Sequence, residues 1–126
     1  MTTIKTPIKS FQDLEVYSIA HALAMEIFTV TRTFPRDEQY SLTDQIRRSS
    51  RSCAVNIAEG WGKRQYENSF KRHLIDSLGS IEETKSWLLF CRDCEYITRE
   101  LCDILMQKYE LLGAKVWTLH TTWKTF

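Results

Sequence analysis

The sequence predicts an all-α fold, an antiparallel up-down-up-down four-helix bundle that forms a single domain over residues 1–126. Four long segments repeat apolar residues at steps of three and four, as the buried face of a helix does. The chain contains only two prolines and four glycines, so few residues would interrupt long helices. No segment alternates polar and apolar residues for long, and we therefore expect no strand.

The first helix is expected at about residues 11–33. Ser10 followed by Asp13 is a typical start signal, because the two side chains can bond free amides of the first turn. Pro35 should end this helix, since proline disfavours the helical state of the residue before it. The segment also has a second apolar face, which usually indicates contact with a partner. The residues of this second face are Val16, Ile19, Ala22, Met25 and Val30.

The second helix is expected at about residues 41–59, where Ser41 and Asp44 repeat the same start signal. Arg47 and Arg51 fall on the face opposite to the apolar one. Gly60 is interpreted as a left-handed stop after the last turn. The residues of the buried face are Leu42, Ile46, Ser49, Cys53, Ile57 and Gly60.

The third and fourth helices are expected at about residues 65–94 and 98–123. Gly79 lies in the middle of the third, where a glycine is ~1 kcal/mol less favourable than alanine. A close helix crossing at Gly79 would explain its presence. Thr98 should cap the fourth helix, which has an acidic residue in its first turn.

The composition indicates a protein without a membrane partner, metal or cofactor. No apolar run approaches a membrane span, and the first residues lack the apolar core of a signal peptide, so we expect a cytoplasmic bacterial protein. In such a compartment the four cysteines should be reduced. Cys91 and Cys94 have the spacing of half a zinc site, but no second pair of ligands follows. We interpret them as small core or surface cysteines.

The sequence offers no catalytic motif, and we expect no enzyme. His21, His73 and His120 fall on three different predicted helices, and none has a recognisable partner signature nearby. The segment EGWGKR contains two glycines and a lysine but lacks the strand and the spacing of a phosphate-binding loop.

Asn56 and Glu59 are interpreted as structural polar residues. Asn56 lies at the edge of the apolar face of the second helix, where a buried amide must be hydrogen-bonded. It should fix the helix register, and Glu59 should pair with a nearby arginine or lysine. A place in a binding cleft or a catalytic site is the alternative for both residues.

Positive charge gathers in one part of the chain. The net charge is only +1, but residues 42–73 contain seven Lys and Arg against three Asp and Glu. Such residues attract phosphates, and exposed aromatic rings can stack on unpaired bases. A solvated face or a subunit contact is the alternative. The candidate nucleic-acid-binding residues are Arg47, Arg48, Arg51, Trp61, Lys63 and Arg64.

Three stretches of the chain resemble a known family. They are FQDLEVYSIAHALAMEIF, FPRDEQYSLTDQIRRSSRSCAVNIAEGWGKR and SFKRHLIDSLGSIEET, and the resemblance covers about residues 10–115. The sequence is similar to the four-helix bundle proteins first noticed in intervening sequences of bacterial 23S ribosomal RNA genes. The segment from Asn56 to Gly60 is among its most specific parts.

The resemblance implies a helical bundle that assembles into a ring-shaped homopentamer, with no assigned catalytic residues. It extends to the accessory proteins of diversity-generating retroelements, which are strongly basic, bind nucleic acid and partner a reverse transcriptase. Two functions therefore stay open at this point. One is an RNA- or DNA-binding accessory or structural factor, and the other is a protein-protein interaction scaffold with no nucleic-acid role.

Overall fold

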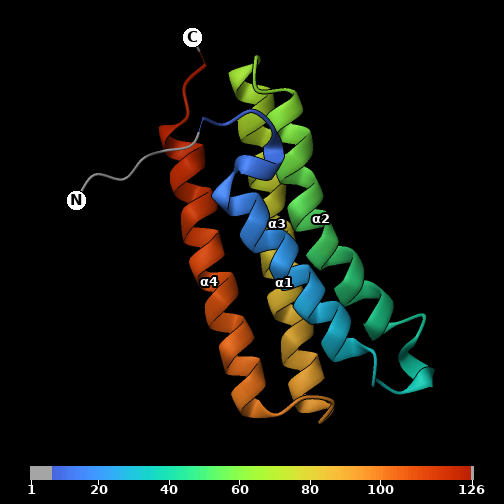
Figure 1. Ribbon diagram of the computed structural model, residues 1–126. Helices are drawn as coiled ribbons and strands as arrows, with labels where there is room; N and C mark the ends of the chain where they lie inside the picture. Colours follow the sequence, from blue (N-terminus) through green and yellow to red (C-terminus); the bar gives the residue numbers. More distant parts are fainter. Residues whose placement is uncertain (1–6, 126) are drawn as a thin grey trace.

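The computed structural model describes residues 7–125, which form four long α-helices (Figure 1). These residues contain no strand, so the prediction of an all-α fold with four helices is confirmed. Two short 3-10 helices, η1 (Phe11–Asp13) and η2 (Arg36–Glu38), precede the first two long helices. The long helices are α1 (Glu15–Thr31), α2 (Leu42–Gly62), α3 (Glu67–Asp93) and α4 (Arg99–Thr122).

Each helix lies beside the next one along the chain, and α1 also contacts α4. Figure 1 shows the chain reversing its direction from each long helix to the next. The hydrogen bonds between α2 and α3 also indicate that these helices run in opposite directions. Thr84 bonds Ser49, whereas Ser80, which comes earlier in α3, bonds Ser52, which comes later in α2. This order of directions is compatible with the up-down-up-down bundle that the sequence predicts.

The core lies between the four helices, and each of them contributes apolar side chains that are fully buried. Burial of one such side chain stabilises the fold by roughly 1.5–3 kcal/mol. The largest buried side chains include Ile27 of α1, Ile46 and Ile57 of α2, Phe70 and Leu74 of α3, and Tyr109 and Leu112 of α4.

The predicted second apolar face of α1 is smaller than the sequence suggests. Val16 is only 5% exposed and belongs to the core, and Ile19 and Val30 pack against the core while half-buried. Only Ala22 and Met25 are exposed. Val16 is therefore reassigned from a partner surface to the interior.

The helix start signals act differently from one helix to the next. Ser10 and Asp13 form a capping box, but it caps η1, and α1 begins after Leu14. The Ser41 side chain does not cap α2, because its hydroxyl donates to the carboxylate of Glu38 instead. Thr98 does cap α4, since its hydroxyl accepts a 3.1 Å hydrogen bond from the amide of Leu101.

Two glycines have roles other than those expected. α2 continues past Gly60, whose φ is not positive, so the predicted left-handed stop at this residue is wrong. Gly60 is buried where α2 approaches α3, and a Cβ on it would lie 2.9 Å from the Cβ of His73. At Gly79 an added Cβ would meet nothing within 4 Å, so no close crossing within the described chain explains this glycine.

The C-terminus of α3 is closed by a Schellman motif that contains no glycine. The amide of Tyr96 donates to the carbonyl of Cys91, and the amide of Glu95 donates to the carbonyl of Arg92. Glu95 has a φ of 63°, in the left-handed region that glycine adopts most easily. The motif satisfies the last carbonyls of α3 and turns the chain toward α4.

Candidate nucleic-acid interface

The structure divides the predicted basic residues into two groups. Arg47, Arg48 and Arg51 lie in the first half of α2, whereas Lys63 and Arg64 follow its C-terminus. At 1.5 Å per residue, Arg47 and Lys63 are separated by about 24 Å along the helix direction. The two groups therefore cannot contact the same phosphate, and each has to be judged from its own surroundings.

Arg47 is held against the end of α1. Its Nε donates a 2.9 Å hydrogen bond to the hydroxyl of Thr31, which is 3% exposed. The guanidinium carbon also lies 4.8 Å from the centre of the Phe28 ring, a distance typical of a cation–π contact. Both contacts restrict the side chain, while the two terminal nitrogens take part in no hydrogen bond among the described residues.

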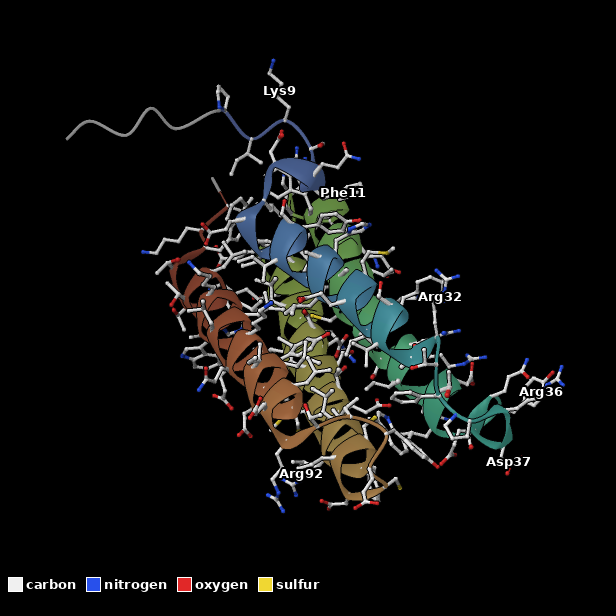
Figure 2. All side chains as sticks on the ribbon, turned by 60° about the horizontal axis from the view of Figure 1, so that its bottom comes forward. Lys9, Phe11, Arg32, Arg36, Asp37 and Arg92 are labelled. Carbon is white, nitrogen blue, oxygen red and sulfur yellow. The ribbon has the colours of Figure 1, made fainter. Side chains whose placement is uncertain are left out.

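Two further arginines approach the same ring. The guanidinium carbons of Arg51 and Arg32 lie 6.0 Å and 5.8 Å from the centre of Phe28. Figure 2 shows the side chain of Arg32 projecting outward at the end of α1. We refer to Arg32, Arg47 and Arg51 as the arginine cluster. Sequence reasoning missed Arg32 and Phe28, although their spacing of four residues places them on one face of a helix.

No carboxylate among residues 7–125 forms a salt bridge with the arginine cluster. Arg48, by contrast, pairs with Asp44 at 2.9 Å and is 75% exposed. The three like charges repel one another, because their guanidinium carbons all lie within 6.0 Å of one ring centre. A bound anion would remove that repulsion.

Trp61 is not an exposed base-stacking residue, which corrects its place in the predicted interface. The side chain is 7% exposed and makes edge contacts with Phe70 and Trp123. The guanidinium carbon of Arg64 lies 4.1 Å from the centre of the Trp61 ring. The packing of α2 against α3 and the C-terminal segment buries the indole, which is a tertiary effect that local sequence does not encode.

The basic residues after α2 are engaged within the protein. Arg64 donates a 2.9 Å hydrogen bond to the carbonyl of Trp61, and Nζ of Lys63 lies 3.1 Å from Nε2 of His73. Lys63 and Arg64 are both exposed, but these contacts hold their side chains against neighbouring residues. They form a weaker candidate for ligand binding than the arginine cluster.

Asn56 lies between α2 and α3 within a row of hydrogen-bonded polar side chains. Its amide nitrogen donates to the carbonyl of Ser52, and its Oδ1 lies 3.2 Å from Nδ1 of His73. Ser52 in turn accepts a 3.0 Å hydrogen bond from Ser80. A neutral His73 that donates from Nδ1 and accepts from Lys63 at Nε2 satisfies this geometry.

Glu59 has a different neighbour from the one expected. Its Oε2 lies 3.9 Å from Nδ1 of His73, and no arginine or lysine among the described residues pairs with it. The carboxylate is 55% exposed, so this contact contributes little to stability. Glu59 and Asn56 thus meet at the same histidine, one from solvent and one from the helix interface.

Three of the four cysteines have the properties of packing residues. Cys53, Cys91 and Cys102 are buried, while Cys94 is exposed. Burial raises the pKa of the Cys53 thiol to about 11 and that of Cys91 to about 12, so both stay protonated at neutral pH. A protonated buried thiol is a poor nucleophile. Within residues 7–125, no three His, Cys, Asp or Glu side chains are placed to hold a metal ion.

The fold and the arginine cluster define a small all-α bundle with a localised cationic surface on α1 and α2. None of its helices within the described residues is long and apolar enough to cross a membrane. The family model described as 23S rRNA-intervening sequence protein matches residues 12–117, and the chain therefore belongs to this family.

The fold is shared by a solved crystal structure of a protein of unknown function from the S23 ribosomal protein family of Bacteroides thetaiotaomicron, with a TM-score of 0.77 and 24% identity. The match covers 85% of this chain and 96% of that protein. Likeness at this identity shows the fold alone. None of the curated proteins matches the chain.

Proposed function

We propose that the protein is a non-catalytic, self-assembling helical bundle that binds the phosphate backbone of RNA or DNA as an accessory or structural factor. The observation that carries this proposal is the arginine cluster, three guanidinium groups gathered on one ring without a carboxylate partner among the described residues. Phosphate oxygens accept hydrogen bonds from such groups and release bound counterions on contact. The family description contains the words 23S rRNA, so RNA is the first nucleic acid to test.

A non-catalytic role is supported by the state of the groups that could act as nucleophiles or bases. The Cys53 and Cys91 thiols are buried, and burial raises the pKa of each. His73 is engaged by Asn56 and Lys63. His120 stacks on Trp117 with ring centres 5.2 Å apart. No hydrogen bond among the described residues joins His73 or His120 to either thiol.

Self-assembly is supported by large apolar side chains that the single chain leaves exposed. Met25 of α1 and Val55 of α2 are each 51% exposed, and Leu111 and Trp117 of α4 are 58% and 52% exposed. Apolar surface of this kind is commonly covered by another copy of the chain. The homopentamer implied by the resemblance is the assembly we propose.

The proposal is tested by measuring the affinity of the purified protein for a panel of labelled nucleic acids at about 50 mM and about 200 mM salt. The panel contains single-stranded and hairpin RNA and single- and double-stranded DNA. We expect binding to at least one member, with an affinity that falls as salt rises. If no member of the panel binds in a salt-sensitive manner, the proposal is rejected.

The second candidate is a protein-protein interaction scaffold with no nucleic-acid role. It is favoured by exposed aromatic side chains around the start of α2 and the end of α3, where Tyr40 is 87% and Phe90 54% exposed. A reverse transcriptase is the partner that the resemblance suggests testing first. If substitutions of Arg47 and Arg51 dissociate the assembly while the chain stays helical, this candidate replaces the first.

A further inference from the structure

We infer that the arginine cluster is a discrete site for two or three consecutive phosphates of one nucleic-acid strand, in which Thr31 and Phe28 hold Arg47 in its binding position. This inference rests on the proposed function and names the residues that carry it. It adds Arg32, Phe28 and Thr31 to the interface and removes Trp61, Lys63 and Arg64 from it.

The first support is the fixed position of Arg47. Nε donates to Thr31 at 2.9 Å, and the hydroxyl of Thr31 is itself anchored 2.8 Å from the carbonyl oxygen of Ile27. The plane of the guanidinium is thereby set by α1, although Arg47 belongs to α2. Its remaining N–H groups form a fork that matches two phosphate oxygens. A side chain fixed before binding loses less conformational entropy when it binds.

The second support is the spacing of the three charges. Because the guanidinium carbons of Arg32 and Arg51 lie 5.8 Å and 6.0 Å from one ring centre, they are at most about 12 Å apart. Successive phosphates of a strand are several ångströms apart, so a cluster of this width spans two or three of them. It is too small to follow a whole helical turn of a duplex.

The third support is that no carboxylate among residues 7–125 neutralises any of the three gathered guanidinium groups, whereas six of the other basic side chains are paired. Six Lys and Arg residues form salt bridges with carboxylates among the described residues, whereas the cluster forms none. Figure 2 shows both situations, because Arg32 extends into solvent while Arg92 lies at the end of α3, where its Nε donates to Asp93. The six paired residues are Arg48, Lys71, Lys85, Arg92, Lys108 and Lys115.

The site should contact the backbone and not the bases. Three guanidinium groups approach the ring of Phe28, and Phe28 itself is only half-exposed. A base therefore has little free ring surface on which to stack. Contacts to phosphates alone carry no sequence information. Binding at this site is therefore expected to be independent of base sequence.

The test measures the affinity of a fluorescein-labelled oligouridine for the full chain over a salt series. Each of Arg32→Gln, Arg47→Gln and Arg51→Gln should weaken binding by about 3- to 10-fold at low salt and reduce the slope of log K against log salt by about 0.7. Arg48→Gln should have a smaller effect, because Asp44 already pairs with that arginine. Arg99→Gln, on the exposed first turn of α4, is the control for net charge and should leave binding unchanged.

Thr31→Val tests the positioning role separately from charge. This substitution keeps all three arginines but removes the acceptor of Arg47 Nε, so affinity should fall about 2- to 5-fold with the salt slope unchanged. Circular dichroism and gel filtration of every variant establish that the fold and the assembly persist. If Arg47→Gln unfolds the chain, the affinities of Arg32→Gln and Arg51→Gln are sufficient to test the inference. Both of these residues are exposed, so their substitution should leave the fold intact.

The outcomes separate the inference from the proposed function. If oligouridine binds and Arg48→Gln or Arg99→Gln weakens it as much as the cluster variants, the discrete site is rejected and a diffuse basic surface remains. If cluster variants dissociate the assembly, the arginines are subunit contacts and the inference is wrong. If the wild-type chain binds no nucleic acid in a salt-sensitive manner, the proposed function fails with it.

Discussion

Gly60 of α2 lies so close to His73 of α3 that a Cβ on the glycine would be 2.9 Å from the Cβ of the histidine. The same atom would lie 3.0 Å from the ring of Phe70. Close approach of the two backbones at this point brings Asn56 within hydrogen-bond reach of His73. The glycine therefore sets the distance between the two helices that share the row of polar side chains.

Gly60→Ala should destabilise the protein, whereas Gly79→Ala should stabilise it. The added methyl group at Gly60 forces α2 and α3 apart, at a free-energy cost of typically 1–3 kcal/mol, or about 2 kcal/mol here. At Gly79 nothing lies within 4 Å, so only the gain in helix propensity of about 0.8 kcal/mol is expected. Urea unfolding of the two variants checks the pair. Equal effects of the two substitutions would contradict the packing role of Gly60.

Glu95→Gly should raise the free energy of unfolding by about 0.5–1 kcal/mol, because a residue with a side chain is strained in the left-handed region. Glu95 is held there by the Schellman motif that ends α3. Thermal unfolding monitored by circular dichroism measures the gain. Glu95→Ala serves as the control, since it removes the carboxylate but keeps the strain and should change stability little. A gain of the same size in Glu95→Ala would point to charge instead.

Asn56→Ala should destabilise the fold by about 1–2 kcal/mol, because it leaves partly buried donors and acceptors of His73 and Ser52 without their partner. Glu59→Gln is the matched control on the same histidine. Its carboxylate is 55% exposed and 3.9 Å away, so its loss should change stability by less than about 0.5 kcal/mol. Chemical denaturation compares the stability of the two variants. A larger loss of stability in Glu59→Gln would show that Glu59, and not Asn56, is the main structural partner of His73.

The free energy of unfolding should decrease as pH rises from 9 to about 11, because the folded Cys53 thiol keeps its proton longer than the unfolded one. Burial raises the pKa of Cys53 from 9.0 to about 11, so its contribution is complete below pH 9 and is lost above that window. The contribution is roughly 2–3 kcal/mol. Unfolding at several pH values compares the wild type with Cys53→Ala, in which the pH dependence should become shallower, while the part due to Cys91 remains. Cys94→Ala, at an exposed thiol, should keep the full pH dependence.

The number of helices could be predicted from the sequence, because every helix of a bundle has apolar residues three and four positions apart on its buried face. Roles that depend on a neighbouring helix could not. A glycine after an amphipathic segment is typical of a helix end, and only the packed structure shows that Gly60 is a contact point with His73. Trp61 has basic neighbours in sequence, but Phe70 and Trp123 bury it.

Only part of the candidate site could be predicted from the sequence. Arg47 and Arg51 are recognisable because they lie four residues apart on the polar face of α2. Their connection to Arg32 crosses from α2 to α1 and becomes apparent only where Phe28 gathers the three side chains. Lys63 and Arg64 share the charge and the stretch of sequence, yet the length of α2 separates them from the cluster.

The arginine cluster as the nucleic-acid contact is the central claim, and a salt titration of oligouridine binding tests it most directly. The wild type is compared with the Arg32→Gln, Arg47→Gln and Arg51→Gln triple variant. Three lost phosphate contacts should reduce the magnitude of the salt slope by about 2 and abolish most of the low-salt affinity, while the circular dichroism spectrum stays helical. A triple variant that binds as tightly as the wild type, with the same slope, would contradict the account.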